Sequence, residues 1–288
     1  MLFLPPRKSE GFELVGVILL SVVALTIISC GIQTDPEENS NPKIKPLKVG
    51  MELAYPPFEM VDDKGSPSGV SVEIAKSLAK DLGRPLEIQN IEFSGLIESL
   101  RSGKIDIIIS SLTATDRRRR VIDFSNGYVS TGLCLLLSNE NASQLSIENL
   151  NDAKYTVAVK RGTTGHVFAD SSLGLAKVRV LENEDACVLE VIQGKADAFI
   201  YDQMSVFRHW NKNRKTTKAN LKPFQQEFWS IGIAKNRSDL KDRINTFLGK
   251  YNSSGGFDDL ADRFLPDEKA AFEELGYPFI FQISGAAQ

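Results

Sequence analysis

The segment LIESLRSGKIDIIIS at residues 96–110 decides the fold class of this chain. Apolar residues at helical spacing are followed by Gly103, which ends the helix, and then by a continuous apolar strand. Such a strand is typical of a parallel sheet that helices cover on both faces. The segment CVLEVIQGKADAFIY at 187–201 repeats this order of apolar helix, Gly-Lys-X-Asp and apolar strand. We therefore expect two similar α/β lobes.

The residues around both segments extend the alternation of strand and helix. In the first lobe, the segment 47–60 is expected to start as a strand and to break at Pro56-Pro57, with further strands at 86–93 and 104–110 and helices at 70–83 and 94–103. The second is expected to have strands at 155–165 and 176–183 and a helix followed by a strand at 184–202. Apolar extended runs at 132–138 and 228–236 predict two crossing strands that form a hinge. The helices at 239–251 and 257–265 should return to the first lobe.

The predicted domain organisation has a discontinuous first lobe. With 288 residues, about two domains are expected. Each lobe should be a mixed, mostly parallel sheet flanked by helices. We predict a signal peptide at 1–29, a lipid-anchored linker at 30–45, lobe 1 at 46–135 plus 229–288, and lobe 2 at 136–228.

The N-terminus has the pattern of an export signal. Arg7 and Lys8 precede an apolar run at 14–28, which is shorter than the roughly 20 residues of a membrane span. The run ends in TIISC, which resembles a bacterial lipobox and makes Cys30 the expected lipidation site. An uncleaved N-terminal anchor is the alternative. Both interpretations place the rest of the chain outside the cytoplasm, in the periplasm or at the cell surface, tethered to a membrane.

Charge and cysteine content narrow the function further. The chain has 34 Lys and Arg against 37 Asp and Glu, which argues against nucleic-acid binding. Cys134 and Cys187 have no metal-type spacing. We expect two buried free thiols, with a disulfide as the alternative. The sequence shows no catalytic constellation, metal site or cofactor motif, and we expect a monomer.

Five motifs in order carry a resemblance to a known family: YPPFEM, GVSVEIAKSLAKDLG, LIESLRSGKIDIIISSLTATDRRRRVIDFS, VAVKRGTTG and GKADAFIYD. The chain resembles the extracellular solute-binding proteins of polar amino-acid ABC transporters over about residues 45–265. This implies a two-lobe periplasmic-binding-protein fold, type II-like, with a free amino acid as ligand and a permease as partner. Val70 and Ser71 depart from the family pattern, and the tail after Pro266 lies outside the resemblance.

The resemblance also assigns the four consecutive arginines, residues 117–120. An arginine fork suits a carboxylate because it makes two parallel charge-assisted hydrogen bonds. The family's arginine lies five residues after the first threonine of T-x-T, which is Thr113 here, so Arg118 is expected to bind the ligand carboxylate. Arg117, Arg119 and Arg120 are expected to face water. Thr113 would contact the ligand through its hydroxyl and amide, and Ser111 would contact the ammonium.

The second lobe supplies the remaining polar contacts that the resemblance implies. Asp202 would accept from the ligand ammonium, with capping of a turn as the alternative role. Thr163 and Thr164 would donate backbone amides to the carboxylate, and the glycines at 162 and 165 would allow the backbone to approach closely.

The ligand side chain is expected between two aromatic faces, Tyr55 and Phe93, either of which could instead be core. Glu52 falls where relatives that bind basic or amide side chains carry an aspartate. A carboxylate beside aromatic rings suits a cation. We therefore predict a basic amino acid (arginine, lysine or histidine), with glutamine next. Glu52 could instead point to solvent.

Two other functions remain open on the same scaffold. An exported enzyme of the cyclohexadienyl dehydratase type would need an acid–base group in the cleft, for which His166 is the candidate. A sensor or host-facing lipoprotein could use the same ligand clamp. We predict that the chain is not an enzyme.

Overall fold

The computed structural model describes residues 44–140 and 142–282. The predicted signal peptide, the lipidation of Cys30 and nearly all of the predicted linker lie outside these residues. Within the described residues, no helix is long and apolar enough to cross a membrane.

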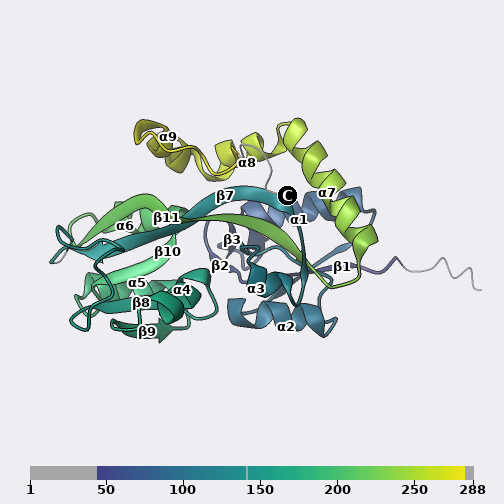
Figure 1. Ribbon diagram of the computed structural model, residues 1–288. Coiled ribbons are helices and arrows are strands. Elements are labelled where there is room, and N and C mark those ends of the chain that lie inside the picture. Colours follow the sequence, from purple (N-terminus) through teal and green to yellow (C-terminus); the bar gives the residue numbers. More distant parts are fainter. Residues whose placement is uncertain (1–43, 141, 283–288) are drawn as a thin grey trace, which may run out of the picture. The chain divides into compact units, whose positions relative to one another are not determined.

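The core of the fold is a mixed eight-stranded sheet in the order β5-β1-β6-β11-β7-β10-β8-β9 (Figure 1). β1 is parallel to β5 and β6, and β8 is parallel to β9 and β10. The strands are β1 (Leu47–Met51), β5 (Leu86–Asn90), β6 (Ile107–Ile108), β7 (Asp123–Ser138), β8 (Thr156–Lys160), β9 (Lys177–Leu181), β10 (Ala198–Asp202) and β11 (Thr217–Ile233). The predicted α/β class is confirmed.

The long strands β7 and β11 join the two groups of parallel strands into one continuous sheet. They pair antiparallel along most of their length, and each also pairs with a strand of one group: β11 with β6, and β7 with β10. The sequence predicts crossing strands at 132–138 and 228–236, but the observed strands are about twice as long. Polar residues such as Asn126 and Lys218 interrupt the apolar pattern, so the runs read from hydropathy are too short. The domain boundaries at 135/136 and 228/229 stay a prediction.

Helices cover the sheet, and a small sheet of β2 (Ala54–Tyr55), β3 (Glu59–Val61) and β4 (Pro67–Ser68) lies beside α1. The helical elements are α1 (Val70–Asp81), η1 (Phe93–Gly95), α2 (Leu96–Arg101), α3 (Asp116–Arg119), α4 (Thr164–Ser172), α5 (Glu184–Ile192), α6 (Gln203–Lys212), α7 (Ser238–Ser253), α8 (Gly256–Phe264) and α9 (Pro266–Glu274). α7 packs on β7 and α1, and α8 packs on α1. The predicted return of the final helices to the first group of strands is therefore confirmed.

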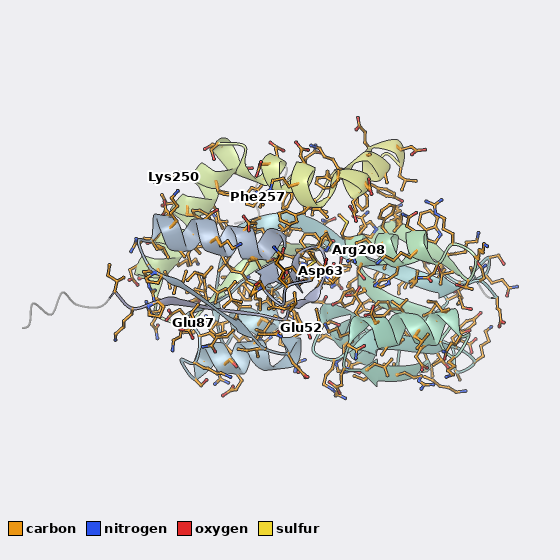
Figure 2. All side chains as sticks on the ribbon, turned by 180° about the vertical axis from the view of Figure 1, so that it is seen from behind. Glu52, Asp63, Glu87, Arg208, Lys250 and Phe257 are labelled. Carbon is orange, nitrogen blue, oxygen red and sulfur yellow. The ribbon has the colours of Figure 1, made fainter. Side chains whose placement is uncertain are left out.

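The tail after Pro266 is packed through aromatic side chains. Phe272 of α9 is fully buried, and its ring centroid lies 5.4 Å from that of Phe207 on α6. Phe281 stacks on Phe257 of α8, labelled in Figure 2, with 5.1 Å between ring centroids. The amide of Ser130 on β7 donates to the carbonyl of Ile280 at 2.8 Å. The tail thus contacts α6, α8 and β7.

The two cysteines of the described residues are separate buried thiols, as predicted. Cys134 lies on β7 and Cys187 on α5. Burial raises the pKa of the Cys187 thiol to about 12.

Candidate functional site

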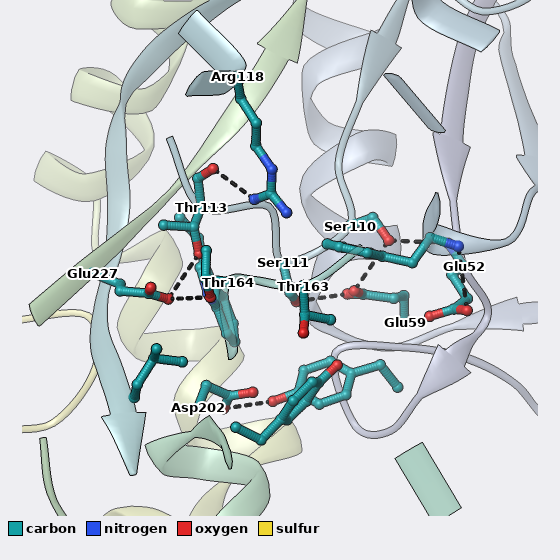
Figure 3. A pocket seen from close by; sticks show the side chains of 15 residues that line it. Glu52, Glu59, Ser110, Ser111, Thr113, Arg118, Thr163, Thr164, Asp202 and Glu227 are labelled. Carbon is teal, nitrogen blue, oxygen red and sulfur yellow. Dashed lines mark hydrogen bonds between the residues drawn. The ribbon is translucent and has the colours of Figure 1, made fainter. Parts of the chain in front are cut away.

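A buried pocket of about 30 Å³ brings all nine predicted ligand-binding residues together (Figure 3). These residues are Glu52, Tyr55, Phe93, Ser111, Thr113, Arg118, Thr163, Thr164 and Asp202. Six further lining residues were not predicted: Glu59, Ser110, Leu133, Tyr201, Glu227 and Trp229. The pocket wall combines one arginine and four carboxyl groups with aromatic and aliphatic side chains. The role of each residue toward a ligand stays a prediction.

Arg118 is the arginine that the fold buries. It lies on α3, where the Thr115 hydroxyl caps the helix by accepting from the Arg118 amide at 3.2 Å. The guanidinium donates to the carbonyls of Thr113 at 2.8 Å and Gly162 at 3.0 Å. Burial lowers the pKa of Arg118 to about 10. Its three neighbours Arg117, Arg119 and Arg120 are exposed, as the sequence predicts.

Asp202 ends β10 and caps α6. Its Oδ1 accepts from the amides of Met204 and Ser205, each at 3.1 Å, and from the Tyr55 hydroxyl at 2.8 Å. Burial, with a further contribution from Glu184, raises the pKa of Asp202 to about 7. The capping role is therefore real. Because all three bonds go to Oδ1, capping is compatible with a contact between Oδ2 and a ligand.

Glu52 forms an ion pair with Lys160, the last residue of β8. The Lys160 side chain is 2 % exposed and that of Glu52 is 13 % exposed, so Glu52 does not point to solvent. The other carboxylate oxygen of Glu52 accepts from the Phe93 amide at 3.3 Å. The Phe93 ring centroid lies 5.7 Å from Lys160 Nζ and 5.4 Å from Arg118 Cζ. Lys160 was missed because a lysine that ends a strand normally reads as exposed.

Glu59 is a second carboxyl group at this end of the pocket, and it was not predicted from the sequence. It accepts from the hydroxyls of Ser71 at 2.5 Å and Ser111 at 3.2 Å. Burial raises the pKa of Glu59 to about 8. The Ser111 hydroxyl is thus directed to Glu59, and Ser111 itself has a left-handed backbone with φ of 48°.

The two other threonines of the pocket lie at the start of α4: Thr163 precedes the helix and Thr164 is its first residue. Thr163 caps α4 by accepting from the His166 amide at 3.3 Å, and it donates to the Lys160 carbonyl at 2.8 Å. Gly162 has φ of 78°, and a Cβ at Gly165 would lie 2.5 Å from the Ile200 carbonyl oxygen. Both positions therefore require glycine, as the sequence suggested.

Tyr55 is both core and pocket wall. Its ring stacks on Phe58 with 5.4 Å between centroids and meets Trp229 edge-on at 6.0 Å. It is 3 % exposed, and its hydroxyl reaches Asp202. The two interpretations of Tyr55 as core or as ligand wall are therefore not exclusive.

His166 does not line this pocket. It lies with Arg117 in a separate, outer groove of about 810 Å³, and Arg118 and Thr164 line both cavities. Its Nε2 lies 3.3 Å from a carboxylate oxygen of Asp170. Among the described residues, no group of His, Cys, Asp and Glu is arranged to hold a metal ion.

The mixed sheet with its flanking helices and this pocket have the α/β architecture of a periplasmic binding protein. The chain belongs to the bacterial extracellular solute-binding proteins, family 3, whose sequence profile matches residues 47–267. Apart from the first two residues of α9, the tail described above lies beyond this match.

Individual relatives cover most of the chain. It is 26% identical over 252 residues to the L-cystine-binding protein TcyJ of Escherichia coli (strain K12), covering 86% of this chain and 94% of TcyJ. The solved ancestral amino acid-binding protein AncCDT-1, a precursor of cyclohexadienyl dehydratase, is 33% identical with a TM-score of 0.70, covering 76% of this chain and 94% of that one. An ancestral arginine-binding protein bound to glutamine is 30% identical with a TM-score of 0.69, covering 76% and 97%.

Proposed function

We propose that this chain binds a free polar amino acid in the pocket and delivers it to the permease of an ABC transporter. One observation carries the proposal: Arg118 and Asp202 reach a single buried pocket from α3 and from the end of β10. A guanidinium and a carboxylate are the two partners that the ends of an amino acid require. Arg118 would hold the carboxylate, and Asp202 Oδ2 would accept from the ammonium.

The Lys160–Glu52 ion pair supports an amide side chain, with glutamine as the first candidate. The pair is already neutral, and Glu52, the member of the pair that lines the pocket, offers an acceptor at the end that Phe93 borders. A side-chain amide can donate to this acceptor through its NH₂ group without adding a charge. Each ligand charge then has one partner, and no charge of the pair is left uncompensated.

A basic amino acid is the second candidate. It is supported by the four carboxyl groups that line the pocket, since a cationic ligand would favour the ionised forms of Glu59 and Asp202, whose pKa values are raised by burial. A cationic side chain would, however, lie beside buried Lys160, and like charges at short range in a buried site repel strongly. The solved relative named for arginine and bound to glutamine supports both candidates.

We further propose that ligand capture closes lobe 2 (136–228) onto lobe 1 (46–135 plus 229–288) by hinge motion. Several contacts join these two segments at or near the pocket. They include Arg118 to the Gly162 carbonyl, Thr113 to Glu227, Tyr55 to Asp202, Lys160 to Glu52, and Arg208, labelled in Figure 2, to the Pro56 carbonyl. A lipid on Cys30 would tether the chain outside the cytoplasm.

A thermal-shift screen of the protein against the twenty amino acids, followed by calorimetry, tests the proposal. A ligand that binds the native state must raise the melting temperature. We expect the largest shift with glutamine. If no amino acid shifts the midpoint, the proposal is wrong. Turnover of prephenate or arogenate would instead support the dehydratase alternative.

A further inference from the structure

Glu227 is a buried carboxyl group that links two ligand-binding segments of the pocket. It lies on β11 opposite Thr131 of β7 and is 4 % exposed. One carboxylate oxygen, Oε2, accepts from the hydroxyls of Thr113 at 3.1 Å and Thr164 at 3.0 Å (Figure 3). The other oxygen accepts from the Gln225 side-chain amide at 2.8 Å.

The two threonines come from distant parts of the chain. Thr113 precedes α3, and its carbonyl also accepts from Arg118, whereas Thr164 is the first residue of α4. Glu227 therefore connects the segment just before α3, the helix that carries Arg118, with the first residue of α4. A strand position 63 residues from Thr164 and 114 from Thr113 makes this link.

These contacts fix the direction of both hydroxyl groups. A hydroxyl has one hydrogen and two lone pairs. When each threonine donates its hydrogen to ionised Glu227, only lone pairs face the pocket. The two hydroxyls can then accept from an ammonium but cannot donate to a carboxylate, which is left to Arg118 and to backbone amides.

We propose that Glu227 is a positioning residue that orients Thr113 and Thr164 as acceptors for the ligand ammonium. This inference rests on the proposed function. The charged groups that face Glu227 are Arg118 on α3 and Asp202 at the end of β10. Burial raises the pKa of Glu227, and the positive charge of a bound ammonium would lower it, so ligand binding is expected to shift this pKa.

The variant Glu227→Gln tests the inference, because it keeps the shape but places an NH₂ donor or a neutral carbonyl in the carboxylate's position. We expect the Kd for glutamine to rise at least tenfold. Calorimetry in buffers of different ionisation enthalpy should show fewer protons released on binding than in the wild type. A purely structural role would not change that proton count.

A double-mutant cycle separates orientation from direct binding. In a Thr113→Val/Thr164→Val background, the hydroxyls are gone and Glu227→Gln should have little further effect on Kd. Glu98→Gln, an exposed change on α2, serves as the matched control and should leave Kd unchanged.

The outcomes distinguish the role of Glu227 from the proposed function itself. Unchanged affinity and proton count in Glu227→Gln, or full additivity in the cycle, would overturn the role of Glu227 while leaving the proposed function intact. A wild-type protein that binds no amino acid would contradict the proposed function itself, and with it the positioning role.

Discussion

Lys160 and Glu52, which are 108 residues apart in the sequence, form an ion pair at the wall of the candidate ligand pocket. The sequence alone suggests that Glu52 is available for a cationic ligand. In the structure, the chain supplies that cation itself. This pair therefore bears directly on which side chain the pocket accepts.

Replacing Lys160 with methionine should change the ligand preference. Lys160→Met keeps an unbranched side chain, one atom shorter, but leaves Glu52 without its partner, so affinity should shift from glutamine toward arginine by at least tenfold in the ratio of their Kd values. The unpaired carboxylate should also lower the free energy of unfolding by about 3–5 kcal/mol.

The double variant Lys160→Met/Glu52→Gln is the control for this change. It removes both charges, so the stability should largely recover and the preference for arginine should disappear. Calorimetry with both ligands and urea unfolding measure the two effects. An unchanged Kd ratio in Lys160→Met would show that the pair does not govern selectivity.

Loss of the Arg118 guanidinium should abolish tight binding. Arg118→Ala leaves the ligand carboxylate without its cation in a buried site, which costs about 3–5 kcal/mol of binding free energy. The exposed neighbour Arg117 provides a matched control, because Arg117→Ala removes the same charge from the same helix. Equal affinity of the two variants for glutamine, measured by calorimetry, would contradict the assignment.

Stability without ligand should fall as the pH rises from about 4 to about 8. Burial raises the pKa of Asp202 from 3.8 to about 7 and that of Glu59 from 4.5 to about 8. The folded chain thus holds protons that the unfolded chain releases, and stability is lost as the pH passes from the unfolded to the folded pKa. Each such carboxyl group contributes up to about 1.4 kcal/mol per pH unit in this window.

Asp202→Asn tests the share of Asp202 in this pH dependence. Asparagine is also a good helix cap, so α6 should be retained. The melting temperature of the variant should fall less steeply between pH 5 and pH 8 than that of the wild type. A slope identical to the wild-type slope would rule out titration of Asp202 in this range.

The tail should contribute strongly to stability. Phe272→Ala removes a fully buried ring that packs on Phe207, which should cost about 3–5 kcal/mol of unfolding free energy. Leu275→Ala, at a side chain that is 44 % exposed, should change it by less than about 0.5 kcal/mol. Denaturant unfolding compares them, and similar midpoints would mean that the tail is not part of the cooperative core.

The fold could be predicted largely from the sequence because its decisive signals are local. The helix, the glycine stop and the apolar strand at 96–110 lie within fifteen residues. The single burial within the arginine run 117–120 also followed from a short motif. The lengths of β7 and β11 did not, because their pairing partners, rather than their own hydropathy, keep polar residues such as Asn126 in strands.

The contacts that tune the pocket could not be read in the same way. Lysine and glutamate are usually exposed, and nothing in the residues next to Lys160 and Glu227 in the sequence predicts that these two are buried. Their roles at the pocket depend on contacts with residues more than sixty positions away in the sequence: Glu52 for Lys160, and Thr113 and Thr164 for Glu227. Such long-range pairs need the folded arrangement of strand ends before they become visible.

The inaccessible thiols of Cys134 and Cys187 have a practical consequence for following this molecule in solution. Because neither sulfur in the described part of the chain reaches solvent, a maleimide dye should react selectively with cysteines introduced there at the surface. Lys250 on α7 and the half-exposed Leu189 on α5 offer two such attachment points. Energy transfer between dyes at these two positions would then report the lobe closure that we propose for ligand binding.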